Sequence, residues 1–126
     1  MVTINKQDRG SGKTSAIISL MTENEKTACL AFNSCAKIFE YPVSLKSRVY
    51  VPCEEDRIED FVYDLRRDKI EILYIDELLV YTKEYLDKLF KLLQRVNIEV
   101  IVYTSWERNW NENIKIKQKY ERKRSC

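Results

Sequence analysis

The sequence predicts an α/β fold, a three-layer sandwich in which helices cover both faces of a mostly parallel sheet of about five strands. Short apolar runs alternate with longer segments whose apolar residues recur at helical spacing, which is the order expected of βα units. The 44% of hydrophobic residues, with only two glycines and two prolines, suits a packed core rather than a disordered chain. A length of 126 residues has room for one core, so we expect one domain over residues 1–126.

The first strand and helix are marked by a change of pattern. Residues 2–5 form a short strand-like run, and the segment that follows is polar and turn-prone up to residue 12. A helix is expected from Lys13, because apolar residues then recur at helical spacing: Ala16, Ile17, Leu20 and Met21. Residues 27–32 are a compact apolar run, typical of a buried parallel strand.

The middle of the chain is less regular. Asn33 or Ser34 can cap a short helix that reaches about Glu40, and Pro42 then ends it. Residues 48–51 have the composition of another short strand.

The second half contains the clearest periodicity. One helix has an apolar face formed by Ile58, Phe61, Val62 and Leu65, and we expect its first turn to hold Glu54, Glu55 and Asp56. A strand is expected over residues 70–75, an amphipathic helix over 82–95 and a second, very apolar strand over 98–103.

Composition also limits the class of protein. No apolar run approaches the roughly 18 residues that cross a bilayer. The N-terminus lacks the basic and then apolar order of a secretory signal. We therefore expect no membrane contact and a cytoplasmic location. The chain has no histidine and no CxxC pair among its four cysteines, so we expect reduced thiols, with Cys29 in the core, rather than a zinc site.

A candidate phosphate-binding loop joins the first strand to the first helix. Gly10 and Gly12 let backbone N–H groups turn inward as an anion nest, and the helix N-terminus adds further donors. Lys13 would reach the β- and γ-phosphates of a nucleoside triphosphate, and the Thr14 hydroxyl would bind Mg²⁺. The full pattern has glycine where this chain has Gln7, and an ordinary glycine turn is the alternative. The expected nucleotide-binding residues of the loop are Arg9, Gly10, Ser11, Gly12, Lys13 and Thr14.

Polar residues also follow two later strands. Asp76 would hold the Mg²⁺ shell through water, because ligands of a parallel sheet lie beyond the carboxyl ends of its strands. Glu77 could act as general base toward a water that attacks the γ-phosphate. Thr104 and Ser105 would contact the nucleotide from the end of the last strand. The alternatives are a helix cap for the acids and a plain turn for the hydroxyls.

In order and spacing these motifs resemble P-loop NTPases of the additional-strand, catalytic-glutamate class, over residues 1 to about 105. The resemblance implies a minimal P-loop NTPase core that binds and hydrolyses Mg·ATP, with Lys13 and Glu77 as catalytic residues. In that class an extra strand separates the loop strand from the strand before the acids, and residues 27–32 are expected to be that strand. A complete core of this class also has a strand that flanks the loop strand on its other side. Either residues 114–120 supply this strand, or the fold is a minimal version that lacks it.

Arg9 makes the loop similar to that of one group within this class, because viral DNA-packaging and terminase-type ATPases often carry an arginine in this loop. That likeness implies that Arg9 is catalytic and acts on the negative charge of the transition state in its own subunit, as an arginine finger does elsewhere. The alternative is that Arg9 is an exposed, solvated arginine. Residues 103–106 and 113–115 also resemble the strand end of DNA translocases, with Lys115 where those proteins have arginine. Such motors bind ATP between subunits. The resemblance therefore implies a viral or mobile-element protein of the host cytoplasm and a homo-oligomer, with Arg95 or Arg108 completing the site in trans.

Charge is unevenly distributed along the chain. Residues 115–124 hold six basic residues and one acid, so this segment carries +5 and the remainder −3 of the net +2. Nucleic acid is a candidate partner of this segment, with Trp106 and Trp110 available to stack on bases. A solvated terminus is the alternative.

Three functions stay open. The first is an ATPase that works on nucleic acid, as in translocation or packaging. The second is a non-hydrolysing, nucleotide-dependent binding module for nucleic acid or a protein. The third is a small nucleoside or nucleotide kinase, against which the Asp76–Glu77 pair favours water as nucleophile. Phosphate release, with and without nucleic acid, separates them.

Overall fold

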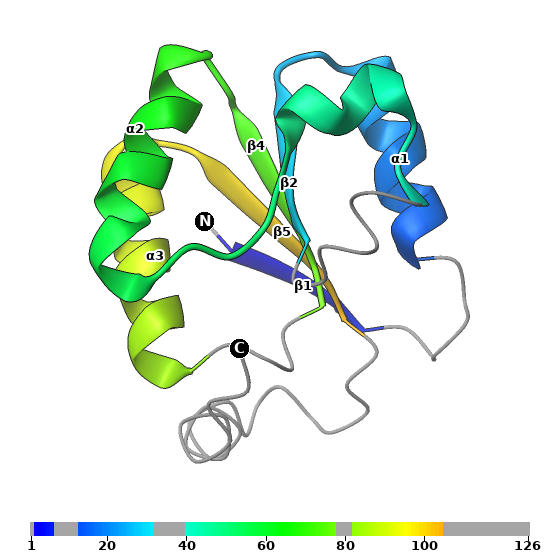
Figure 1. The fold of residues 1–126 in the computed structure, drawn as a ribbon. Helices are drawn as coiled ribbons and strands as arrows, with labels where there is room; N and C mark the ends of the chain where they lie inside the picture. Colours follow the sequence, from blue (N-terminus) through cyan, green and yellow to red (C-terminus); the bar gives the residue numbers. More distant parts are fainter. Residues whose placement is uncertain (1, 7–12, 32–39, 78–81, 105–126) are drawn as a thin grey trace.

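Five strands form one parallel sheet in the computed structural model, which describes residues 2–6, 13–31, 40–77 and 82–104 (Figure 1). The strands are β1 (Val2–Lys6), β2 (Thr27–Ala31), β3 (Val49–Tyr50), β4 (Ile72–Asp76) and β5 (Glu99–Thr104). Their order in the sheet is β1-β5-β4-β2-β3, and every neighbouring pair is parallel. The predicted α/β fold class is therefore confirmed.

The helices lie on both faces of this sheet. They are α1 (Lys13–Glu23), α2 (Ile58–Arg67) and α3 (Lys83–Arg95), together with the short 3-10 helices η2 (Val43–Arg48) and η3 (Glu55–Arg57). In Figure 1, α2 and α3 cover one face and α1 covers the other. Within the described ranges, no helix has the length and apolar character that crossing a membrane requires.

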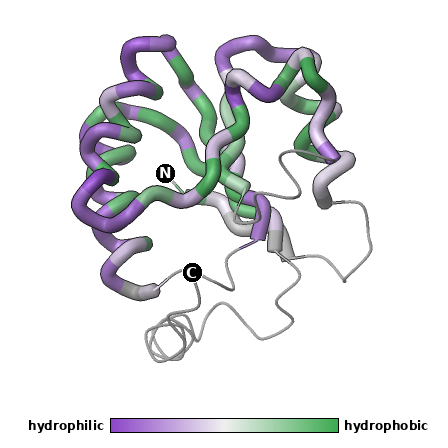
Figure 2. Tube along the Cα trace, in the orientation of Figure 1, coloured by the Kyte–Doolittle hydropathy of each residue, from purple (hydrophilic) through white to green (hydrophobic). Residues whose placement is uncertain are grey.

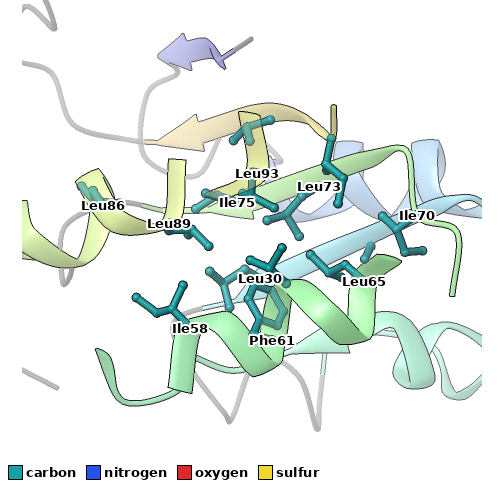
Figure 3. Close-up of a cluster of buried hydrophobic side chains, with 14 of the residues drawn as sticks. Leu30, Ile58, Phe61, Leu65, Ile70, Leu73, Ile75, Leu86, Leu89 and Leu93 are labelled. Atoms are coloured by element: carbon teal, nitrogen blue, oxygen red, sulfur yellow. The ribbon is translucent and has the colours of Figure 1, made fainter. Parts of the chain in front are cut away.

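The larger core lies between the sheet and the pair α2 and α3. Side chains of a strand point alternately to its two faces, so Leu73 and Ile75 of β4 face this core together with Leu30 of β2. Figure 3 shows these side chains meeting the apolar faces of the two helices. Both helices carry hydrophilic residues as well as hydrophobic ones along their length, as Figure 2 shows. They are therefore amphipathic helices that each bury one face.

The smaller core lies on the opposite face, under α1 and η2. It contains the alternate strand residues Cys29, Ala31 and Tyr74, packed against Ile17 and Met21 of α1. Cys29 is fully buried, which confirms its predicted place in the core. Because Asp76 follows Tyr74 by two residues, the strand directs it to this same face.

The predicted position of one strand in the sheet was wrong. Residues 27–32 were expected in that place, but β2 lies on the far side of β4, and β5 lies between β1 and β4. The register shows this directly, since β5 pairs with both β1 and β4 along its length. A buried parallel strand is apolar on both faces, so the two runs carry the same pattern and their order cannot be read from it.

Three smaller boundaries also differ. Glu55 and Asp56 lie in η3 and Glu54 precedes it, so these acids come before α2 rather than in its first turn. The strand expected over 48–51 is reduced to β3, because η2 continues to Arg48. The helix expected from residue 33 or 34 and the edge strand over 114–120 lie outside the described residues, except for Glu40.

Candidate functional site

The carboxyl ends of three strands meet at one edge of the sheet. Lys6 of β1 pairs with Thr104 of β5, and Asp76 of β4 pairs with Tyr103 of β5. In Figure 1 these ends gather at the same side of the molecule. This edge is where parallel sheets bind their ligands.

A hydrogen bond joins two of the predicted magnesium residues. The Thr14 hydroxyl donates to Oδ2 of Asp76 at 2.8 Å, across 62 positions of sequence. Thr14 lies in the first turn of α1, and Asp76 is the last residue of β4, with 6% of its surface exposed. The fold therefore brings the start of the first helix to the acidic end of the fourth strand.

A second donor reaches the same carboxylate oxygen. The Tyr41 hydroxyl donates to Oδ2 of Asp76 at 2.9 Å and lies 3.2 Å from Sγ of Cys29. Burial is the main cause that raises the pKa of Tyr41 and that of Cys29, so both groups keep their protons at neutral pH. Tyr41 was not among the predicted site residues. No spacing rule marks it, because its partner in β4 lies 35 positions away.

Glu77 leaves the strand in an unusual backbone conformation. Its φ is 83°, in the left-handed region that glycine favours. Its backbone N–H donates to the carbonyl of Tyr103 at 2.7 Å, and 5% of the residue is exposed. The bond to β5 holds the chain in this turn directly after Asp76, at the same edge of the sheet.

The other predicted site residues are placed only in part. Lys13 and Thr104 are located by their backbone, as the first residue of α1 and the last of β5. The loop residues Arg9, Gly10, Ser11 and Gly12, and also Ser105, lie outside the described residues, so their roles stay predictions.

The oxygen atoms at this edge suit magnesium. Mg²⁺ prefers hydroxyl, carboxylate, phosphate and water oxygens, and the Thr14 and Asp76 side chains supply the first two types. In the part of the chain that the structure describes, no group of three or more histidine, cysteine, aspartate or glutamate residues could hold a metal ion. A nucleotide-bound Mg²⁺ does not need such a group, because phosphates and waters supply most of its ligands.

Comparison with known proteins gave no match. No protein-family model, curated protein or solved structure is similar enough to the chain to be matched to it. What the site can do is therefore argued from its own residues and their geometry.

Proposed function

We propose that this protein binds a nucleoside triphosphate with Mg²⁺ at the carboxyl ends of β1, β4 and β5, and that it hydrolyses the triphosphate. The observation that carries the proposal is the 2.8 Å bond between the Thr14 hydroxyl and the Asp76 carboxylate. Thr14 ends a glycine-rich phosphate-loop pattern, and Asp76 ends an apolar strand before a second acid. Thr14 and Asp76 are far apart in sequence, and their side chains are in contact in space. A parallel sheet brings these two ends to the same edge, but a chance glycine turn and an unrelated helix cap do not require a direct bond between the Thr14 hydroxyl and the Asp76 carboxylate.

The sheet order supports membership of the additional-strand class of P-loop NTPases. One strand, β5, lies between the loop strand β1 and the acidic strand β4. That is the arrangement which the sequence resemblance implies, although a different strand takes the place. The likeness to viral DNA-packaging ATPases, through Arg9, remains part of this proposal.

Each residue has a distinct role in the proposed reaction. Lys13 binds the β- and γ-phosphates, with Arg9 adding positive charge where negative charge develops. Thr14 would hold Mg²⁺ directly and Asp76 would hold its shell through water, and the ion when bound would neutralise phosphate charge. Glu77 accepts a proton from the attacking water.

Phosphate release by a Glu77→Gln variant tests the chemistry. The amide keeps the shape of the side chain but cannot accept a proton. We expect Mg·ATP binding to persist while turnover falls by roughly 10²- to 10⁴-fold. Glu71→Gln is the matched control, because Glu71 lies at the opposite end of β4 with its side chain 64% exposed. It should hydrolyse ATP like the unaltered protein.

The same assay separates the alternative functions. Binding without any turnover in the unaltered protein would indicate a nucleotide-dependent binding module. Phosphate transfer to an added nucleoside or nucleotide would indicate a kinase. If Glu77→Gln turned over as fast as the unaltered protein, Glu77 would not be the base.

The proposed partners follow from the resemblance and the charge distribution. Arg95, at the end of α3, is exposed and lies at the edge of the sheet opposite the site, because the following strand β5 starts there. It could therefore act on a nucleotide only in a neighbouring copy of the chain. Arg108 and the basic segment 115–124, proposed to contact nucleic acid, lie outside the described residues.

A further inference from the structure

We propose that Tyr41 is a positioning residue, which holds the Asp76 carboxylate in the orientation that binds the Mg²⁺ shell. The inference rests on the proposed function, because it assigns a supporting residue to the same site. No motif in the sequence points to Tyr41, and it makes its contribution through Asp76 rather than by touching the nucleotide.

The two hydrogen bonds to Asp76 come from separate parts of the fold. The Thr14 hydroxyl reaches Oδ2 from α1 at 2.8 Å, and the Tyr41 hydroxyl reaches the same atom from the segment before η2 at 2.9 Å. A carboxylate held by two donors on one oxygen has little freedom to rotate. Both contacts are made by Oδ2, so neither of them uses the lone pairs of Oδ1.

The direction of each hydrogen bond in this cluster follows from the number of protons available. Tyr41 has a single hydroxyl proton, which it donates to Oδ2 of Asp76. The contact of 3.2 Å between the Tyr41 oxygen and Sγ of Cys29 therefore has the thiol as donor. The chain of bonds runs from Cys29 through Tyr41 to Asp76, with each polar atom in it satisfied.

The tyrosine ring is fixed by packing that does not depend on its hydroxyl. Tyr41 is 3% exposed and belongs to the smaller core with Ile17, Met21 and Leu45. Directly after it, the backbone N–H of Leu45 donates to the carbonyl of Pro42 at 2.9 Å and starts η2. Phenylalanine should therefore keep the ring in place and remove only the bond to Asp76.

The test is a Mg²⁺ titration of ATP binding by the Tyr41→Phe variant. Loss of an outer-shell hydrogen-bond partner of a metal site typically weakens metal binding by about 10- to 100-fold. We expect the Mg²⁺ concentration for half-maximal ATP binding to rise by that factor, while ATP affinity measured in EDTA stays unchanged. Tyr85→Phe is the matched control: it removes another buried hydroxyl, which lies 3.7 Å from Sγ of Cys53 in the opposite core. It should leave the Mg²⁺ requirement unchanged.

The outcomes separate the inference from the proposed function. If the unaltered protein bound ATP equally with Mg²⁺ and with EDTA, the proposed function would fail. If its binding needed Mg²⁺ and Tyr41→Phe had the same requirement, only the role of Tyr41 would be wrong. Equal loss of affinity in EDTA would show that Tyr41 serves folding alone and would also overturn the inference. Cys29→Ala gives a second reading, because removing the donor to Tyr41 should shift the Mg²⁺ requirement in the same direction by a smaller factor.

Discussion

At the scale of single residues, the turn at Glu77 is the clearest departure from ordinary backbone geometry among the described residues near the site. Its φ of 83° is unfavourable for any residue with a Cβ atom, at a cost of roughly 1–2 kcal/mol. The bond from its N–H to the Tyr103 carbonyl holds it there. Strain of this kind persists where the surrounding structure over-determines the backbone, often at functional sites.

A pair of variants measures this strain. Glu77→Gly and Glu77→Ala both remove the carboxylate, but only glycine adopts the positive φ without a steric cost. We expect the glycine variant to unfold at higher urea concentration, with a free energy of unfolding roughly 1 kcal/mol above that of the alanine variant. In an ordinary strand the order would be the reverse. Equal stability, or a more stable alanine variant, would show that the turn is not strained.

Sequence patterns could predict some residues of the site and not others. Thr14 and Asp76 each belong to a local motif, so they were predicted as ligands and the structure brings them into contact. Tyr41 belongs to no local motif, because its role arises from a contact across 35 positions that only the fold creates. The positive φ of Glu77 depends on its bond to β5, which no local pattern encodes.

At the scale of elements, α2 ends in a Schellman motif that leads directly into the core. The N–H of Lys69 donates to the carbonyl of Arg66 at 2.9 Å, and that of Ile70 donates to Leu65 at 3.0 Å. Lys69 takes the left-handed position with φ of 60°, where glycine is most common. Ile70 and Leu65 are both buried in the larger core, so the motif directs the chain from the helix toward β4.

The end of α3 has the same geometry with a different residue. Asn97 has a φ of 62°, and its backbone N–H donates to the carbonyl of Gln94 at 3.2 Å. The backbone N–H of Ile98 donates to the carbonyl of Leu93 at 3.0 Å. We expect Lys69→Gly to raise the free energy of unfolding by roughly 0.5–1 kcal/mol, because glycine removes the steric cost of the left-handed conformation. Asn97→Gly should gain less, because asparagine tolerates that conformation better. Urea denaturation of both variants checks the order, and a larger gain at Asn97 would contradict it.

Periodicity predicted the type of each described element better than its place or its ends. The apolar faces of α2 and α3 follow helical spacing, and both helices form over those apolar residues, although α2 begins later than expected, at Ile58. The 3-10 helix η2 was not predicted, since a short helix of this kind has too few residues to show a period. The order of β2 and β5 could not be predicted either, because both are buried runs with no mark of their neighbours.

At the scale of the whole molecule, the sheet separates the site from the larger core. Helices α2 and α3 pack on one face, and α1 and the candidate magnesium residues lie on the other. Alternation along β4 produces this division, because Ile75 faces the larger core while Asp76 faces α1. Substitutions at Asp76 should therefore act on ligand binding with less effect on the larger core. Assembly and nucleic-acid binding stay predictions, because they involve other molecules and residues 105–126.

Calorimetric titration of Mg·ATP into the unaltered protein and into Lys13→Ala tests the central claim most directly. Lys26→Ala is the control, because it removes the same charge from an exposed residue (56%) that directly precedes β2, at the other edge of the sheet. We expect the unaltered protein and Lys26→Ala to bind alike. Lys13→Ala should lose at least about 2 kcal/mol, a roughly 30-fold weaker affinity, because it removes a charged contact to the phosphates. Absence of binding in the unaltered protein, or unchanged affinity in Lys13→Ala, would contradict a phosphate-binding loop at this edge of the sheet.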